Sequence, residues 1–251
     1  MSVQAKLTKR ERRRIRREGN EVPVQQAKQK QSFKIRNIQP ITNNQETVFE
    51  EWNDGQNLLL HGVAGTGKTF LGFYLGLTEV LNDDSHYKSV TIVRSAVPTR
   101  DMGFLPGNLT EKSRAYELPY YAIATELYGR GDAYELLKNR NHVEFITTSH
   151  VRGITLNDTI VVVDEIQNLT FHELDSIITR CGNNCKIIMC GDFRQNDLGG
   201  QGENSGIKQF MNIIKKLSSF SFIEFDNDDI VRSKLVKEYI IIKGKTNGSG
   251  F

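Results

Sequence analysis

Residues Leu58-Leu59-Leu60-His61-Gly62-Val63-Ala64-Gly65-Thr66-Gly67-Lys68-Thr69 place an apolar run directly before the pattern Gly-x-x-x-x-Gly-Lys-Thr. The apolar run is typical of a buried strand, and the residues from Lys68 to Leu81 predict a helix after it. Glycines between strand and helix let the backbone wrap around an anion, and the helix amino terminus adds positive potential. A glycine-rich turn without a ligand is the alternative, and the strand–loop–helix context argues against it. The stretch therefore predicts a phosphate-binding loop (P-loop) for a nucleotide.

Each part of this loop has an expected role toward bound ATP. The amine of Lys68 should reach the β- and γ-phosphates, and the hydroxyl of Thr69 should bind Mg²⁺. Upstream of the first strand, Gln45 either reads the edge of the adenine or begins a surface helix. The residues predicted to contact the nucleotide are Gln45, Gly62, Val63, Ala64, Gly65, Thr66, Gly67, Lys68, Thr69 and Phe70.

Two carboxylates follow a second apolar run. Ile160-Val161-Val162-Val163 predicts a buried strand, and Asp164 and Glu165 come directly after it. Buried carboxylates are costly unless they face a cation or solvent. We therefore expect Asp164 to join Thr69 around Mg²⁺, and Glu165 to polarise the water that attacks the γ-phosphate. A strand that ends in acids is common by itself, but next to a P-loop it indicates ATP hydrolysis.

A third apolar run ends at Cys190 and leads into Gly191-Asp192-Phe193-Arg194-Gln195. If this strand lies beside the one that ends at Asp164, Gln195 can act as a sensor of the γ-phosphate next to the hydrolytic water. A polar turn is the alternative. Cys190 itself reads as a small buried core residue, because its spacing from Cys181 and Cys185 does not suit zinc and no His accompanies them.

The wider pattern predicts an α/β fold of the RecA-like P-loop NTPase class, with a doubly wound, mostly parallel sheet whose active edge lies at the strand carboxyl ends. We expect one domain over 37–243, a disordered basic tail over 1–36 and a flexible end over 244–251. The predicted strands are Asn57–His61, Ser89–Arg94, Val143–Thr147, Thr159–Asp164, Lys186–Cys190 and Phe220–Phe225, and the further helices are Phe171–Arg180, Ser205–Leu217 and Ile230–Ile242.

The charge is distributed unevenly along the chain. Residues 1–36 hold 12 Lys and Arg against 3 Asp and Glu, a net charge of +9, which leaves the other 215 residues at −6. Clustered cations bind nucleic acid by releasing counterions, whereas a solubilising tail is the alternative. The sequence has no apolar run near the roughly 18 residues of a membrane span. We therefore expect no membrane partner and a cytoplasmic protein, in the host cytoplasm if its source is viral.

With these motifs the chain resembles the PhoH family, whose ATPase domain is similar to the first motor domain of superfamily 1 helicases. The resemblance covers about 38–242. It rests on the P-loop, Met102–Gly107 with Glu111-Lys112, Arg152–Leu156, Asp164–Asn168, Thr179-Arg180, Gly191-Asp192 with Gln195 and Asp197-Leu198, and Asp229–Arg232. Ile166 and Asn108 depart from the family pattern, and neither has a catalytic assignment. A compact chain with a basic tail is most similar to the stand-alone members found in bacteriophages.

The resemblance implies ATP hydrolysis coupled to RNA or single-stranded DNA, and a homo-oligomeric ring such as a hexamer. With one motor domain per chain, a neighbouring subunit can complete each site with an arginine. The candidates are Arg94, Arg152, Arg180 and Arg232, of which Arg232 is the one we assign to catalysis; a local salt bridge with Asp228 or Asp229 is the alternative for it.

The long connection Ala96 to Lys112 shows no clear secondary structure, and its Phe104-Leu105-Pro106 suits stacking on bases, packing on a partner or a buried flap. The reaction itself also has more than one interpretation. A small-molecule kinase such as a nucleoside kinase, and a slow nucleotide-gated binding switch, are the alternatives to a nucleic-acid-coupled ATPase.

Overall fold

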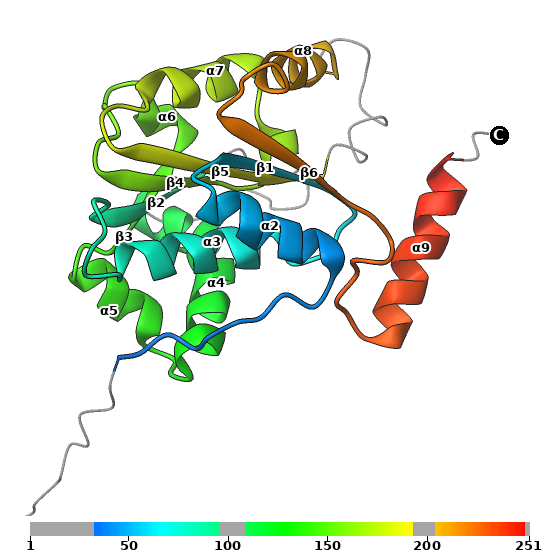
Figure 1. Ribbon diagram of the computed structural model, residues 1–251, viewed down its shortest axis with the longest axis horizontal. Coiled ribbons are helices and arrows are strands. Elements are labelled where there is room, and N and C mark those ends of the chain that lie inside the picture. The colour runs from blue at the N-terminus through cyan, green and yellow to red at the C-terminus, as the bar shows by residue number, and fades with distance from the viewer. Residues whose placement is uncertain (1–32, 96–108, 193–203, 249–251) are drawn as a thin grey trace, which may run out of the picture. The chain divides into compact units, whose positions relative to one another are not determined.

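A sheet of six parallel strands forms the centre of the fold, in the order β3-β2-β4-β5-β1-β6 (Figure 1). The structure, a computed structural model, describes residues 33–95, 109–192 and 204–248. The strands are β1 (Asn57–Gly62), β2 (Ser89–Arg94), β3 (Val143–Thr147), β4 (Thr159–Val163), β5 (Cys185–Gly191) and β6 (Phe220–Phe225). All six match the predicted strands to within a residue, and their parallel pairing confirms the doubly wound α/β fold of the RecA-like class.

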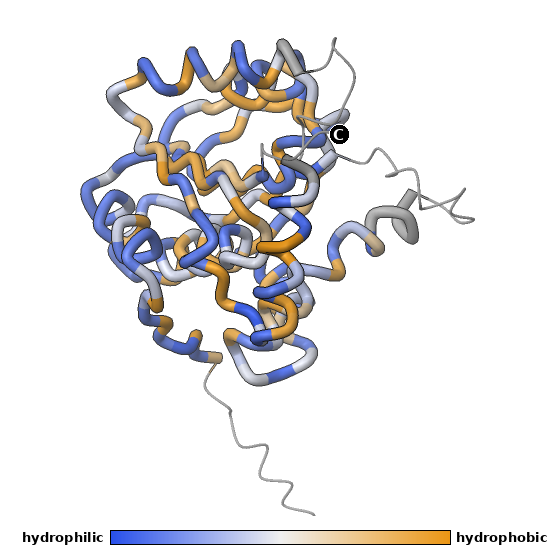
Figure 2. The backbone as a smooth tube through the Cα atoms, turned by 90° about the vertical axis from the view of Figure 1, so that its right-hand side faces the viewer, coloured by the Kyte–Doolittle hydropathy of each residue, from blue (hydrophilic) through white to orange (hydrophobic). Residues whose placement is uncertain are grey.

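Helices cover both faces of this sheet, which explains why the strands are apolar at successive positions. One face carries α2 (Asn43–Asn53), α3 (Lys68–Val80), α4 (Leu109–Tyr128) and α5 (Ala133–Asn139), and the other carries α6 (Thr148–Val151), α7 (Phe171–Arg180) and α8 (Asn204–Ile214) (Figure 1). A short 3-10 helix, Ile166–Asn168, follows β4, and α9 (Lys234–Gly248) follows β6. Along the tube in Figure 2, hydrophobic stretches are most frequent toward the interior and hydrophilic ones toward the periphery.

Helix α3 lies very close to the sheet because two of its residues are glycines. A Cβ at Gly72 would lie 3.2 Å from the sulfur of Cys190, and a Cβ at Gly76 would lie 3.2 Å from Val90. Cys190 is 1% exposed, which confirms it as a small core residue. The close approach fixes the first turn of α3, and with it the end of the P-loop, against β4 and β5.

Several element boundaries differ from the sequence prediction. Helices α2, α4, α5 and α6 were not predicted as such, and α4 already begins at Leu109, inside the connection predicted to lack structure up to Lys112. Helix α9 begins at Lys234 rather than Ile230, because Ile230 is buried and the N–H of Val231 donates to the carbonyl of Gly65, so these residues do not form the first turn of a helix. It continues to Gly248, into the segment predicted as a flexible end, since no proline stops it.

The basic segment 1–32 and the loop 96–108, with Phe104, lie outside the described residues. No helix in the described part of the chain is both long enough and apolar enough to cross a membrane.

Candidate nucleotide-binding site

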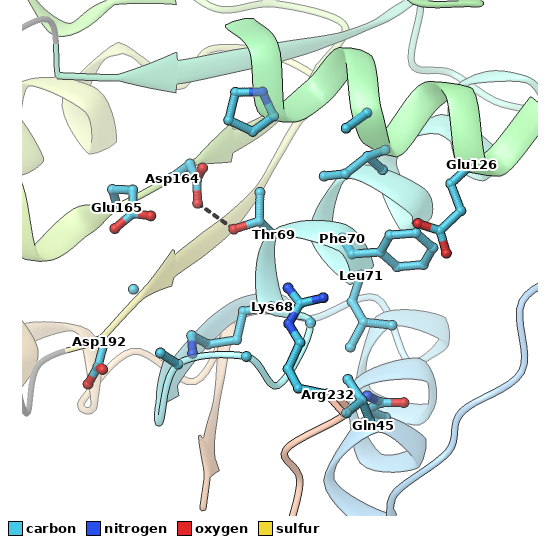
Figure 3. A pocket seen from close by; sticks show the side chains of 18 of the residues that line it. Gln45, Lys68, Thr69, Phe70, Leu71, Glu126, Asp164, Glu165, Asp192 and Arg232 are labelled. Carbon is cyan, nitrogen blue, oxygen red and sulfur yellow. Dashed lines mark hydrogen bonds between the residues drawn. The ribbon is translucent and has the colours of Figure 1, made fainter. Parts of the chain in front are cut away.

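A cavity of about 770 Å³ lies at the carboxyl ends of the central strands, where open α/β sheets bind their ligands. Its lining comes from the P-loop, the first turn of α3, the ends of β2, β4 and β5, one side of α4, and the segments that precede α2 and α9. Figure 3 shows the P-loop and the start of α3 in the middle, with Asp164 and Glu165 on one side and Gln45 on the other.

The P-loop takes a conformation that depends on glycine at three positions. Gly62 has φ 119°, Gly65 has φ 80° and Gly67 has φ 87°, values that side chains with a Cβ rarely adopt. A Cβ at Gly62 would also lie 2.0 Å from the carbonyl oxygen of Phe225, to which the neighbouring Val63 donates its N–H at 3.1 Å. The loop is therefore anchored to the end of β6 by a contact that only glycine permits.

Lys68 lies within this loop and is 9% exposed. Its amine donates to the carbonyl oxygens of Gly62 at 2.9 Å and Val63 at 2.7 Å, and to the hydroxyl of Thr66 at 3.3 Å. Burial lowers the pKa of Lys68, while the nearby carboxylates, Asp192 first among them, oppose that shift. The predicted phosphate-binding cation thus sits where the loop curls around an anion.

Asp164 and Thr69 come together as the sequence predicts. The Thr69 hydroxyl donates to Oδ1 of Asp164 at 2.7 Å, and Asp164 is 3% exposed (Figure 3). A hydroxyl and a carboxylate are the hard oxygen donors that Mg²⁺ prefers. The residues present therefore fit Mg²⁺, which Thr69 and Asp164 would hold. Tyr120 of α4 also donates to Asp164, a contact without a counterpart in the sequence prediction.

Glu165 is held next to Asp164 by a backbone turn and by one side chain. Its φ of 54° and ψ of 45° lie in the left-handed region. The amide of Gln167 donates to its carboxylate through Nε2 and accepts from the N–H of Asp192 through Oε1 at 3.0 Å. Burial and the charge of Asp164 raise the pKa of Glu165, against the opposing effect of Arg94. Gln167 therefore ties Glu165 to the end of β5, a role that we did not assign from the sequence.

Gln45 lies at the third position of α2, so it does begin a helix; that helix exposes one face, but the side chain of Gln45 is buried. It is 4% exposed, and both ends of its amide are engaged: Oε1 accepts from the N–H of Ile41 at 2.9 Å, and Nε2 donates to the carbonyl of Thr66 at 3.2 Å. Thr42 caps the helix by accepting from the N–H of Gln45. In this geometry Gln45 braces the P-loop from the side of the cavity.

The family model for "PhoH-like protein" matches residues 37–243. The chain belongs to the PhoH-like protein family. Among its relatives, the PhoH-like protein of Bacillus subtilis (strain 168) is 36% identical over 187 residues, which cover 74% of this chain and 57% of that protein. Protein PhoH of Escherichia coli (strain K12) is 29% identical over 182 residues, covering 72% of this chain and 51% of its own length. The chain thus spans little more than half the length of these relatives.

Solved structures resemble this family member only distantly. The large terminase of a thermophilic bacteriophage aligns with a TM-score of 0.47 and 15% identity, over 80% of this chain and 50% of that one. The Hef helicase domain of Pyrococcus furiosus aligns with a TM-score of 0.44 and 14% identity, over 74% of this chain and 38% of that one.

The four candidate arginines lie in different places. Arg232 lies in the chain's own cavity, where a Cβ at Gly65 would be 3.0 Å from its Cγ, and the N–H of Val231 donates to the carbonyl of Gly65 at 3.1 Å. Arg94 lines the same cavity at the end of β2. Arg152 follows α6 and is exposed, and Arg180 ends α7 beside the amino end of β4.

This placement alters the interpretation of Arg232. A side chain that lies against its own P-loop can reach a nucleotide of its own chain, and a role of this exposed arginine toward a neighbouring subunit stays a prediction. The alternative of a salt bridge with Asp228 or Asp229 also gains no support, because Arg232 is absent from the ion pairs of the described residues, and Asp229 accepts from the side chain of Asn44 at 2.7 Å and from the N–H of Asp226. The proposed sensor, Gln195, lies outside the described residues.

Proposed function

We propose that this chain hydrolyses ATP with Mg²⁺ in the cavity of the P-loop. The observation that carries this proposal is the arrangement of two adjacent acids. Asp164 is bonded to the P-loop threonine, whereas Glu165 is bonded to Gln167 and has a raised pKa. Asp164 is therefore placed to bind a cation, and Glu165 is placed to accept a proton. Hydrolysis of a phosphoanhydride needs both of these functions.

The residues of the chain then have separate tasks. Lys68 offsets the negative charge of the β- and γ-phosphates, and the backbone N–H groups of the P-loop orient them. Thr69 and Asp164 would hold Mg²⁺, which would supply positive charge to the phosphate oxygens. Glu165 takes the proton of the attacking water, and Gln167 fixes the direction of its carboxylate. Arg232 and Arg94 add positive charge at the same cavity.

Glu165→Gln is the sharpest test of this assignment. The change keeps the shape of the side chain but removes the base, so kcat for ATP should fall by about 10²- to 10⁴-fold, with ATP affinity within about two-fold of that of the unaltered protein. Phosphate release measures the first quantity, and titration of a fluorescent ATP analogue measures the second. Equal turnover in the variant would contradict the role of Glu165. A nucleoside kinase would instead transfer phosphate to an added nucleoside.

The pH dependence of hydrolysis provides a second readout. Glu165 must be ionised to accept a proton, so the rate should fall as the pH falls through its pKa. Because that pKa is raised above the ordinary value of 4.5, the loss should begin at a higher pH than for an ordinary glutamate. A profile that is flat down to pH 4.5 in a folded protein would argue against Glu165 as the base.

We further propose that hydrolysis is coupled to binding of RNA or single-stranded DNA by a homo-oligomer of this chain. The net charge of +9 over residues 1–36 supports a polyanionic partner. Deletion of residues 1–18, which hold eight Lys and Arg between Lys6 and Arg17, should reduce the slope of the salt dependence by about 0.7 for each phosphate that the shortened chain no longer binds. An unchanged salt dependence would make the segment a solubilising tail, and stimulation of ATPase by single-stranded RNA would separate a motor from a slow switch.

A further inference from the structure

Both carboxylate oxygens of Asp164 accept a hydrogen bond, and the two donors belong to different elements. Oδ1 accepts from the hydroxyl of Thr69 at 2.7 Å, and Oδ2 accepts from the hydroxyl of Tyr120 at 2.8 Å. Thr69 lies in the first turn of α3, whereas Tyr120 lies in the middle of α4. Asp164 is 3% exposed, so the protein rather than solvent determines how the carboxylate is turned.

The ring of Tyr120 is held so that its hydroxyl cannot leave this position easily. Tyr120 is completely buried, and its ring packs edge-on against Phe73, with the centroids 5.9 Å apart, and against Phe145 at 6.1 Å. Phe73 lies one turn after Thr69 on α3. The same helix therefore supplies one ligand of the predicted metal site and a wall that aims the tyrosine at the other ligand.

A tyrosine is a suitable donor at this place because it carries no charge. The ordinary pKa of a tyrosine hydroxyl is about 10, so the group is neutral at physiological pH. A lysine or arginine here would hold the carboxylate as well, but its positive charge would oppose the binding of a cation. Tyr120 does not line the cavity, although its neighbours Pro119 and Ile123 do.

We propose that Tyr120 is a positioning residue for Mg²⁺ binding: by engaging Oδ2 of Asp164, it keeps Oδ1 turned toward Thr69. This inference rests on the proposed function of the cavity and deepens it. Tyr120 acts through Asp164 and contacts neither phosphate nor water. Partners that orient metal ligands typically affect metal affinity by 10- to 100-fold, which sets the scale of the expected effect.

Tyr120→Phe tests the proposal, because it removes the hydroxyl and keeps the ring between Phe73 and Phe145. The probe is the fluorescence of N-methylanthraniloyl-ADP titrated with MgCl₂, which needs no turnover. The Mg²⁺ concentration at half-saturation should rise by about ten-fold in the variant. Binding of the same ADP analogue in EDTA should stay within two-fold, because the P-loop is intact.

Tyr134→Phe is the matched control. Tyr134 is also fully buried and also packs on Phe73, at 6.3 Å, but its hydroxyl lies near Glu117 rather than Asp164. It should leave the Mg²⁺ midpoint unchanged. A purely structural role of Tyr120 predicts the same behaviour for both variants, whereas a metal-positioning role separates them.

Three results would overturn the proposal. An Mg²⁺ midpoint of Tyr120→Phe within two-fold of the unaltered protein would make the hydrogen bond structural only, with the proposed function intact. Equal midpoint shifts in both tyrosine variants would show a general effect of core loosening. Nucleotide binding by the unaltered protein that ignores Mg²⁺ would refute the metal site, and the role of Tyr120 with it. If Tyr120→Phe fails to fold, Phe145→Leu, which changes the ring that packs on Tyr120, takes its place as the test. Its Mg²⁺ midpoint should rise about two- to three-fold, and an unchanged Mg²⁺ midpoint would overturn the proposal.

Discussion

Gly191→Ala is a small change that should disable the site without touching a catalytic group. Gly191 ends β5, and a Cβ there would lie 2.5 Å from Cγ1 of Ile166 and 2.7 Å from Oε1 of Gln167. The second distance is 0.7 Å short of the 3.4 Å at which ordinary contacts begin, so Gln167 must move by about that much. Its bonds to Glu165 and to the N–H of Asp192 cannot both survive such a movement.

Overpacking of this kind costs about 1–3 kcal/mol in the free energy of unfolding. A displacement approaching 1 Å at a group that orients the base should lower kcat by about 10- to 100-fold. Urea unfolding and phosphate release under saturating ATP measure the two effects. Gly131→Ala is the control, because a Cβ at Gly131 meets nothing within 4 Å. If Gly191→Ala lost stability but kept its turnover, Gln167 would not be what positions Glu165.

Three other changes separate roles within the fold. Lys68→Ala should abolish measurable hydrolysis and weaken ATP binding at least about ten-fold, since it removes a charged donor; residual turnover in a purified preparation would contradict this. Gln45→Ala should weaken ATP and GTP binding alike, by about 3- to 10-fold, because its amide bonds only the chain in this geometry; a loss confined to ATP in competition titrations would instead mean that Gln45 reads adenine. Lys186, buried over the ring of Trp52, has its pKa lowered to about 8 by burial, below the ordinary 10.5. Between these two pH values the unfolded chain therefore binds more protons than the folded protein. The free energy of unfolding should thus rise from about pH 8 to pH 10.5, compared with that of Lys186→Met. Urea unfolding at several pH values measures this difference, and a difference that does not change with pH would refute the lowered pKa.

The sheet could be predicted because its strands are apolar at successive positions. This pattern follows directly from burial of both faces of the sheet, so it can be read from the sequence. Helix α4 was harder to recognise. Its buried residues Tyr116, Tyr120, Ala124 and Leu127 do recur every three or four positions, but Pro119 interrupts them, and proline usually ends a helix. The signal for α2 was present in Thr42, a residue type that favours the amino-terminal cap, three positions before Gln45.

At the site, the sequence predicts the groups whose spacing is local and leaves out those that packing brings together. The P-loop and Asp164-Glu165 follow from short motifs, and the structure joins them through Thr69. Tyr120 and Asp164 are 44 residues apart, and Gln167 and Asp192 are 25 apart. Neither pair has a motif, because each contact exists only once α4 and β5 are placed against β4.

The left-handed backbone of Glu165 has a consequence for attempts to make this protein more robust. A residue other than glycine or asparagine in that region carries about 1–2 kcal/mol of steric strain. Asparagine at position 165 would relieve part of it and would also delete the proposed base. A screen for heat resistance alone should therefore favour replacement of this glutamate, whereas a screen for ATP turnover should reject the same variants. At position 165 the residue that is best for stability therefore differs from the residue that is best for ATP turnover. A glutamate in this unfavourable backbone conformation is expected if selection has acted on the reaction.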